Sequence, residues 1–170
     1  MKVHTVTRTK GGSKQYLCTA CHEPILPGQK YHHWTPYRST TRQRHVSCGY
    51  PRPTELSNSK IAVVDEAVQD LDLSGNVEDM KAALEGLAST AEEVASEYND
   101  SADGIESHFP SGNPTSEACR NVAEALESWA QELQSWDPDD REEDDDEDDY
   151  LDACRESAQE LVGNKPEYEG

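Results

Sequence analysis

The chain has 170 residues, a formal charge of −20 and a hydrophobic content of 34%. This content lies below the roughly 45–50% of ordinary globular domains, and phenylalanine occurs once, so a single large core is not expected. No run approaches the roughly 18 apolar residues of a membrane helix, and the chain does not start with the apolar stretch of a secretion signal, so we expect a cytoplasmic protein without membrane contact.

The charge is divided unevenly along the chain. Residues 1–60 contain ten Lys or Arg and two acids, a net charge of +8. Residues 61–170 contain five basic residues and 33 acids, a net charge of −28. This division predicts two parts, a basic domain at residues 1–56 and an acidic helical domain at residues 57–170.

The basic part contains three predicted strands. Val3–Thr7 alternates and is rich in β-branched residues, which is typical of a strand. Residues 30–37 are rich in aromatic side chains, and residues 42–45 are expected to return antiparallel to them, which gives a β-hairpin. The prolines that follow this hairpin delay any helix until about Thr54.

Three cysteines and a histidine of the basic part have the spacing of metal ligands. Cys18-x2-Cys21 is followed, after 23 residues, by His45-x2-Cys48. A Cys-x2-Cys turn directs two thiolates to one point, and a second pair completes a tetrahedron. Three thiolates and an imidazole fill the coordination of zinc. We therefore expect one structural Zn²⁺ with no open position for a catalytic water.

The spacing leaves two alternatives to this interpretation. Another imidazole, from His22, His32 or His33, could replace His45 as the fourth ligand. We prefer His45 because its spacing from Cys48 mirrors that of the first pair. A redox Cys-x2-Cys pair is disfavoured because no thioredoxin-like alternation of strands and helices follows. A basic part of about 50 residues with few core residues also needs a staple such as zinc to fold.

The residues around the predicted ligands include Ile25, Pro27-Gly28, Tyr31 and Arg44. With these residues, segment 16–48 resembles the zinc finger of the poly(ADP-ribose) polymerase type. That family uses a Cys-Cys-His-Cys set around a β-hairpin to bind DNA breaks. The ligands that the resemblance implies are Cys18, Cys21, His45 and Cys48.

The segment at residues 51–56 reads Pro-Arg-Pro-Thr-Glu-Leu. With a finger before this segment and acidic helices after it, the whole chain resembles a family of small proteins encoded by phages of actinobacteria. The resemblance implies a phage protein located in the host cytoplasm, and it does not assign a function.

Helical periodicity begins after residue 57. Apolar residues at steps of three and four predict helices at about 58–72, 77–108, 115–136 and 150–162, with Thr115 as the cap of the third. Residues 137–149 hold eleven acids among thirteen residues, so an extended acidic linker is expected there.

The helices at 77–108 and 115–136 carry heptad patterns and are joined by a short Pro/Gly loop. This predicts an antiparallel coiled-coil hairpin, although the same apolar stripe could pair two chains as a homodimer. Cys119 and Cys154 fall on apolar stripes and are interpreted as buried small residues. The expected fold is therefore a small α+β zinc finger, treble-clef-like with a β-hairpin, followed by a mainly α-helical antiparallel coiled-coil hairpin.

The chain carries no sequence motif of an enzyme. A P-loop, a glycine-rich dinucleotide turn, a nucleophile elbow and paired catalytic carboxylates are all missing from the sequence. We therefore expect a protein without catalytic residues that acts by binding.

Two binding functions fit the charge distribution. In the first, the finger at residues 1–56 binds DNA or RNA, with basic side chains on phosphates and an aromatic ring on a base. In the second, the acidic helices at residues 77–162 bind a basic partner protein, as an adaptor or as an inhibitor that imitates nucleic acid. The residues predicted for the nucleic-acid contact are Lys14, Lys30, Trp34, Arg38, Arg42 and Arg44.

Overall fold

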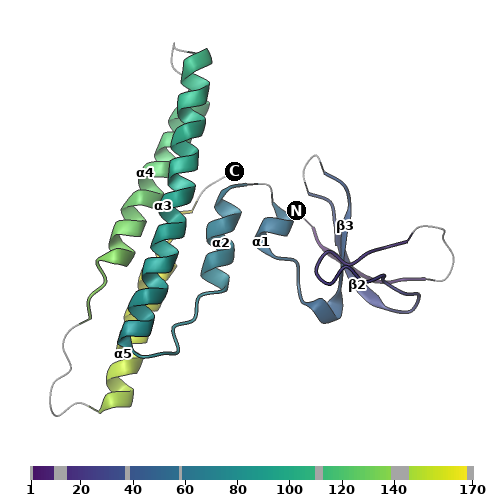
Figure 1. Ribbon diagram of the computed structural model, residues 1–170, viewed down its shortest axis with the longest axis horizontal. Helices are drawn as coiled ribbons and strands as arrows, with labels where there is room; N and C mark the ends of the chain where they lie inside the picture. The colour runs from purple at the N-terminus through teal and green to yellow at the C-terminus, as the bar shows by residue number, and fades with distance from the viewer. Residues whose placement is uncertain are drawn as a thin grey trace. The chain divides into compact units, whose positions relative to one another are not determined.

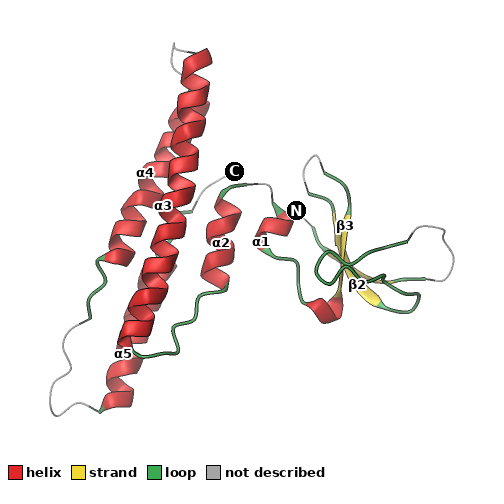
Figure 2. Ribbon diagram, viewed as in Figure 1, coloured by secondary structure: helices red, strands yellow, loops and turns green. Residues whose placement is uncertain are grey.

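The computed structural model divides the chain into two compact units, Met1–Ala62 and Val63–Gly170. Its strands belong to the first unit and its long helices to the second (Figures 1 and 2). This matches the α+β composition expected from the sequence. The residues that the structure describes are 2–9, 15–36, 39–57, 59–109, 113–138 and 146–167.

The first unit is built on a three-stranded antiparallel sheet in the order β1-β2-β3. Its strands are β1 (His4–Thr7), β2 (Lys30–Trp34) and β3 (Arg42–His45). Strand β2 ends earlier than the sequence pattern indicated, and Tyr37 lies outside the described residues. The β2–β3 pair is the predicted hairpin, and β1 adds a third strand to its open side.

Strand β2 has one buried face and one open face. Side chains of a strand alternate between the two faces of a sheet, and here His32 and Trp34 are buried while Tyr31 and His33 are only partly covered. The fully buried side chains on the core side of this unit include Ile25 and Trp34. The core is therefore small, as the composition of the segment indicated.

Glu55 ties the short helix α1 (Pro53–Leu56) to the rest of the first unit. Its carbonyl oxygen accepts a hydrogen bond from Trp34 Nε1 at 2.8 Å, and its carboxylate forms an ion pair with Arg44 and accepts from Thr19 Oγ1 at 2.9 Å. One residue thus links α1 with β2, with β3 and with the turn that carries the first two cysteines. This explains why an acid occurs in an otherwise basic segment.

The second unit contains the long helices. Helix α2 (Ile61–Gln69) spans the boundary between the units, and α3 (Val77–His108), α4 (Pro114–Gln134) and α5 (Glu147–Gly163) follow. The cap of α4 is Asn113, whose Oδ1 accepts from Thr115 N at 2.8 Å, and the expectation that Thr115 is the cap is wrong. Pro114 occupies the first helical position, which suits proline because it has no backbone N–H that needs a hydrogen-bond acceptor there.

Helices α3 and α4 lie side by side and run antiparallel (Figure 1). Lys81, near the start of α3, pairs with Asp137 just beyond the end of α4, whereas Arg120, near the start of α4, pairs with Glu106 near the end of α3. Most of the apolar stripe forms the buried seam. Tyr98, Ile105, Cys119 and Val122 on the stripe are half-buried, and Phe109 lies beyond the end of α3 and is 60% exposed. A helical hairpin is therefore present, and its coiled-coil geometry stays a prediction. The buried seam residues are Met80, Leu84, Leu87, Ala88, Ala91, Val94, Ala95, Ala102, Ala123, Leu126, Trp129, Ala130 and Leu133.

Helix α5 docks on the hairpin through two indole hydrogen bonds. Trp129 Nε1 donates to the Leu161 carbonyl at 2.9 Å, and Trp136 Nε1 donates to Ser157 Oγ at 3.2 Å. Cys154 is buried, as predicted, whereas Cys119 is only half-buried. None of the described helices combines the length and the apolar character that a membrane crossing requires.

Helix α5 starts three residues earlier than the apolar pattern indicated. Asp146 caps it by accepting from Asp148 N at 2.9 Å, and the first turn is made of three acids. Negative side chains are favoured at a helix N-terminus because the peptide dipoles leave partial positive charge there. The end of the acidic stretch is therefore helical, which corrects the prediction of an extended linker through residue 149, while residues 139–145 lie outside the described residues.

Candidate metal centre

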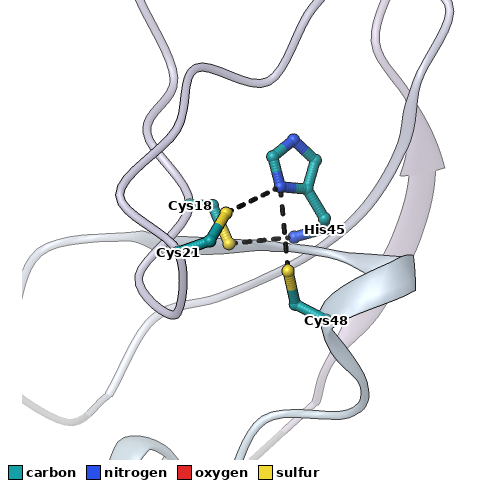
Figure 3. Close-up of side chains that lie close together, drawn as sticks. All are labelled: Cys18, Cys21, His45 and Cys48. Carbon is teal, nitrogen blue, oxygen red and sulfur yellow. Dashed lines mark hydrogen bonds between the residues drawn. The ribbon is translucent and has the colours of Figure 1, made fainter.

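Four side chains from two parts of the first unit converge on one point (Figure 3). Cys18 and Cys21 come from the turn between β1 and β2, and His45 is the last residue of β3. Cys48 ends the short 3-10 helix η1 (Val46–Cys48) that follows directly. The order of turn, hairpin and second pair is the one that the sequence spacing predicted.

The turn that carries the first pair is tightly closed. The backbone N–H of His22 donates to the Cys18 carbonyl at 3.0 Å, and the N–H of Cys18 donates to the Glu23 carbonyl at 3.0 Å. His22 adopts a φ of 60°, in the left-handed region that few residues other than glycine occupy. This closure places the thiols of Cys18 and Cys21 on the same side of the turn.

The four ligand atoms have the spacing of a small tetrahedral site. They lie within 4.8 Å of one another, with His45 Nδ1 at 3.5 Å from Cys21 Sγ and at 4.0 Å from Cys48 Sγ. Around zinc, bonds of about 2.3 Å to sulfur and 2.0 Å to nitrogen place neighbouring ligand atoms about 3.5–3.8 Å apart. A slight contraction of the set is therefore sufficient to hold one metal ion.

The side chain of Gln29 determines which ring nitrogen of His45 carries the proton. His45 Nε2 lies 3.3 Å from Gln29 Oε1, and the same oxygen accepts from the backbone N–H of Leu26 at 2.6 Å. Because this oxygen can only accept, the Nε2 atom is the one that carries the proton, and the lone pair of Nδ1 is directed to the thiols. A ligand histidine held by such a partner is typical of a metal site. Sequence reasoning missed Gln29, because no spacing rule marks a partner of this kind.

The pKa values of Cys18 and Cys48 are shifted in opposite directions. Burial raises the pKa of Cys18, but hydrogen bonds from the backbone N–H groups of Cys21, His45 and Ala20 outweigh it and lower that pKa to about 6. Burial and the neighbouring thiols of Cys21 and Cys18 raise the pKa of Cys48 to about 11. Three thiolates at one point repel one another, and a bound cation relieves this repulsion. The donor set therefore fits a metal ion electrostatically as well as geometrically.

The other candidate histidines lie elsewhere in the first unit. His22 is exposed, and His32 points to the buried face, with Nδ1 2.9 Å from Thr5 Oγ1. His33 stacks on His4 with ring centroids 5.2 Å apart. Of the imidazoles left open by the sequence, His45 is the one that joins the three thiols.

Two of the residues predicted to contact nucleic acid are part of the framework instead. Trp34 is 1% exposed, so the expectation that its ring is a surface for stacking is wrong. The Arg44 side chain is 12% exposed, and besides its ion pair with Glu55 its Nε donates to the Cys48 carbonyl at 3.0 Å. Arg44 therefore holds the second ligand pair against α1, and this position corrects the prediction of a surface cation.

The remaining predicted contacts are scattered. Lys30 is exposed, and Arg42 is half-buried with Nη1 at 3.4 Å from the Glu55 carbonyl. Lys14 and Arg38 lie outside the described residues. Among the described residues that were predicted to contact nucleic acid, Lys30 is therefore the one that is exposed to solvent.

Comparisons of the chain with protein-family models, with curated proteins and with solved structures gave no match. The resemblances to the poly(ADP-ribose) polymerase finger and to phage proteins therefore rest on the residues that carry them. They stay predictions.

Proposed function

We propose that the protein is a non-enzymatic zinc-binding protein whose basic first unit contacts nucleic acid. The zinc part is supported by the donor set, because three cysteine thiolates and one histidine are the ligands of closed structural zinc sites. All four corners of the tetrahedron are occupied by protein atoms. No corner is left for a reactive water, so the metal has a structural role.

The expected role of the metal is to join two segments that are distant in sequence. These segments are the turn with Cys18 and Cys21 and the end of β3 with His45 and Cys48, and few side chains in the described part of the first unit are buried. A unit of this size seldom folds on so small a core without a staple. Zinc bound at the cluster provides this staple.

Replacing Gln29 by Ala is expected to lower the affinity for Zn²⁺ by about 10–100-fold, the usual effect of removing the hydrogen-bond partner of a ligand histidine. Without the amide oxygen, the His45 ring loses the contact that fixes its tautomer and orientation. The measurement is competition for zinc against a chromophoric chelator in the full chain.

The control for this prediction is Gln43→Ala, a matched change on β3 at a side chain whose amide nitrogen donates to the Thr41 carbonyl. Gln29→Glu keeps an acceptor oxygen and is expected to retain tight binding. Equal zinc affinities for Gln29→Ala and Gln43→Ala contradict the proposed role of Gln29.

The nucleic-acid part of the proposal is supported by the charge of the first unit. Residues 1–60 carry a net charge of +8. One of the two acids in this segment, Glu55, is already paired with Arg44 inside the fold, so Glu23 is the remaining one. A small unit with this charge attracts an anionic polymer, and the metal site gives it a fixed shape.

The full chain is expected to bind DNA and RNA oligonucleotides with an affinity that falls steeply as the salt concentration rises, because binding to phosphates releases counterions. Lys30→Gln removes one exposed cation, and we expect a roughly three- to tenfold weaker affinity and a salt slope lower by about 1. Fluorescence anisotropy with labelled oligonucleotides at low and moderate salt measures both quantities.

The matched control is Lys81→Gln on α3, which makes the same change in net charge on the acidic unit. It is expected to leave the salt slope unchanged. If the full chain binds no nucleic acid at low salt, or if both variants behave alike, the proposed contact is wrong.

A second binding function is supported by the charges of the second unit. Every Lys and Arg described there is already paired with an acid, and the surface keeps a large excess of carboxylates. We propose, as the alternative, that this unit binds a basic partner protein. Titration of the full chain with a lysine-rich peptide at physiological salt tests this alternative. Saturable one-to-one binding supports it. Weak binding whose strength depends only on the net charge of the peptide contradicts it.

A further inference from the structure

The open face of the small sheet carries aromatic rings. On β2, Tyr31 and His33 alternate with the buried His32 and Trp34 and are only partly covered. His4 is paired with His33 across the sheet and is exposed. The open face of an antiparallel sheet usually carries polar side chains, so a set of partly exposed rings there is informative.

Four rings form one continuous row, which we call the ring row: His4, His33, Tyr31 and Tyr16. Ring centroids are 5.2 Å apart between His4 and His33, 6.0 Å between His33 and Tyr31, and 5.8 Å between Tyr31 and Tyr16. At the Tyr16 end, the guanidinium of Arg8 lies 5.0 Å from the ring centroid. The row therefore runs from strand β1 across β2 to the segment before the metal ligands, and it ends at a cation.

The position of Arg8 is held by the backbone on both sides. Its N–H donates to the Gln29 carbonyl at 2.9 Å, its carbonyl accepts from Gly28 N at 2.8 Å, and its side chain donates to the Ile25 carbonyl. Gly28 adopts a φ of 90°, which glycine tolerates without strain. The positive charge is thus fixed at one end of the ring row.

We propose that the ring row is a binding surface for single-stranded nucleic acid. The proposal rests on the nucleic-acid function proposed above. In it, bases of the single-stranded nucleic acid stack on the rings, and one phosphate pairs with Arg8. Partly exposed rings on a sheet are suited to unpaired bases, because every base has a flat face that stacks on an aromatic side chain. The net charge of +8 on residues 1–60 complements the strand's phosphates. Paired bases in a duplex are stacked on one another and do not reach the rings.

The test compares binding of the full, zinc-loaded chain to a short mixed-sequence single strand, as DNA and as RNA, and to the matching duplex. Single strands are expected to bind more tightly than the duplex. Tyr16→Ala is expected to weaken single-strand binding about tenfold, while the salt slope stays the same because the lost contact is not ionic. Tyr16→Phe keeps the ring and is expected to restore the affinity.

The matched control is Tyr50→Ala, which removes a 61% exposed ring that contacts the buried-face residue His32 rather than the ring row. It is expected to leave single-strand binding unchanged. If Tyr16→Ala does not bind zinc one to one, His33→Ala tests the same row from β2.

The outcomes separate this inference from the proposed function. Salt-dependent binding that is stronger for the duplex, or that is unchanged in Tyr16→Ala and His33→Ala, overturns the ring row and leaves the basic unit as a nucleic-acid binder. Failure of the unaltered chain to bind any of these oligonucleotides overturns both. Tighter single-strand binding that depends on Tyr16 supports both.

Discussion

Removing zinc from the full chain with excess chelator is expected to unfold the first unit and leave the helices of the second unit folded. Bound zinc contributes on the order of 10 kcal/mol of apparent free energy to a small module, more than the small core around Trp34 and Ile25 can replace. The second unit has a separate core along α3, α4 and α5. We therefore expect the fold of the first unit, and not that of the second, to depend on the metal.

The chain carries three tryptophans that report on this experiment. Trp34 belongs to the first unit, whereas Trp129 and Trp136 belong to the second. Each indole N–H is hydrogen-bonded and is expected to give a distinct NMR signal. On chelation, the Trp34 signal should move to its random-coil position and the other two should stay in place.

Cys48→Ser is expected to reproduce the effect of the chelator on Trp34, because it removes one ligand from the cluster. The matched control is Cys119→Ser on α4, a half-buried thiol outside the cluster, which should leave the Trp34 signal unchanged. An unchanged Trp34 signal in protein shown by elemental analysis to be free of metal contradicts a structural role for the ion.

The sequence predicted the convergence of Cys18, Cys21, His45 and Cys48 well, because the spacing within each pair is a local property. Two Cys or His residues separated by two others converge in a turn whatever surrounds them. The sequence does not determine which of four histidines is the fourth ligand. The choice depends on which ring shares a face with the cysteines and on the Gln29 oxygen that orients it, and both follow from strand register.

The aromatic strand shows what could not be predicted. Residues 30–37 carry rings on both alternating faces, so periodicity does not say whether Tyr31 and His33 or His32 and Trp34 face the core. The buried face is determined by a contact with Glu55, which lies 21 residues further along the chain. Its carbonyl oxygen accepts a hydrogen bond from the Trp34 indole N–H. For this reason the predicted contact residue Trp34 is buried, whereas Tyr31 on the same strand lies on the open face.

Helix boundaries depended on polar residues that an apolar pattern ignores. The long stripes placed α3 and α4 well, because burial along a seam requires spacings of three and four. The starts of α4 and α5 are set instead by the side chains of Asn113 and Asp146, which accept backbone N–H groups. Capping is local, but several Asp, Asn and Thr residues near each start are candidates for it.

Trp129→Ala is expected to lower the free energy of unfolding of the second unit by about 3–5 kcal/mol, the usual cost of truncating a large buried aromatic residue. The ring is 2% exposed, and its Nε1 donates to Leu161 near the end of α5. The substitution leaves a cavity in the hairpin and also removes one of the two indole contacts that hold α5. Urea unfolding followed by helical circular dichroism measures the change.

Trp129→Phe separates the two parts of this effect. It keeps most of the buried ring and removes the hydrogen bond, so the expected loss is smaller, about 1–2 kcal/mol, and amide hydrogen exchange should quicken in α5 rather than in α3. The control is Gln131→Ala, an exposed position on the same helix, where a change within about 0.5 kcal/mol is expected. A loss below about 1 kcal/mol for Trp129→Ala, or faster exchange spread evenly over α3, α4 and α5 in Trp129→Phe, is incompatible with an indole that anchors α5 to the hairpin.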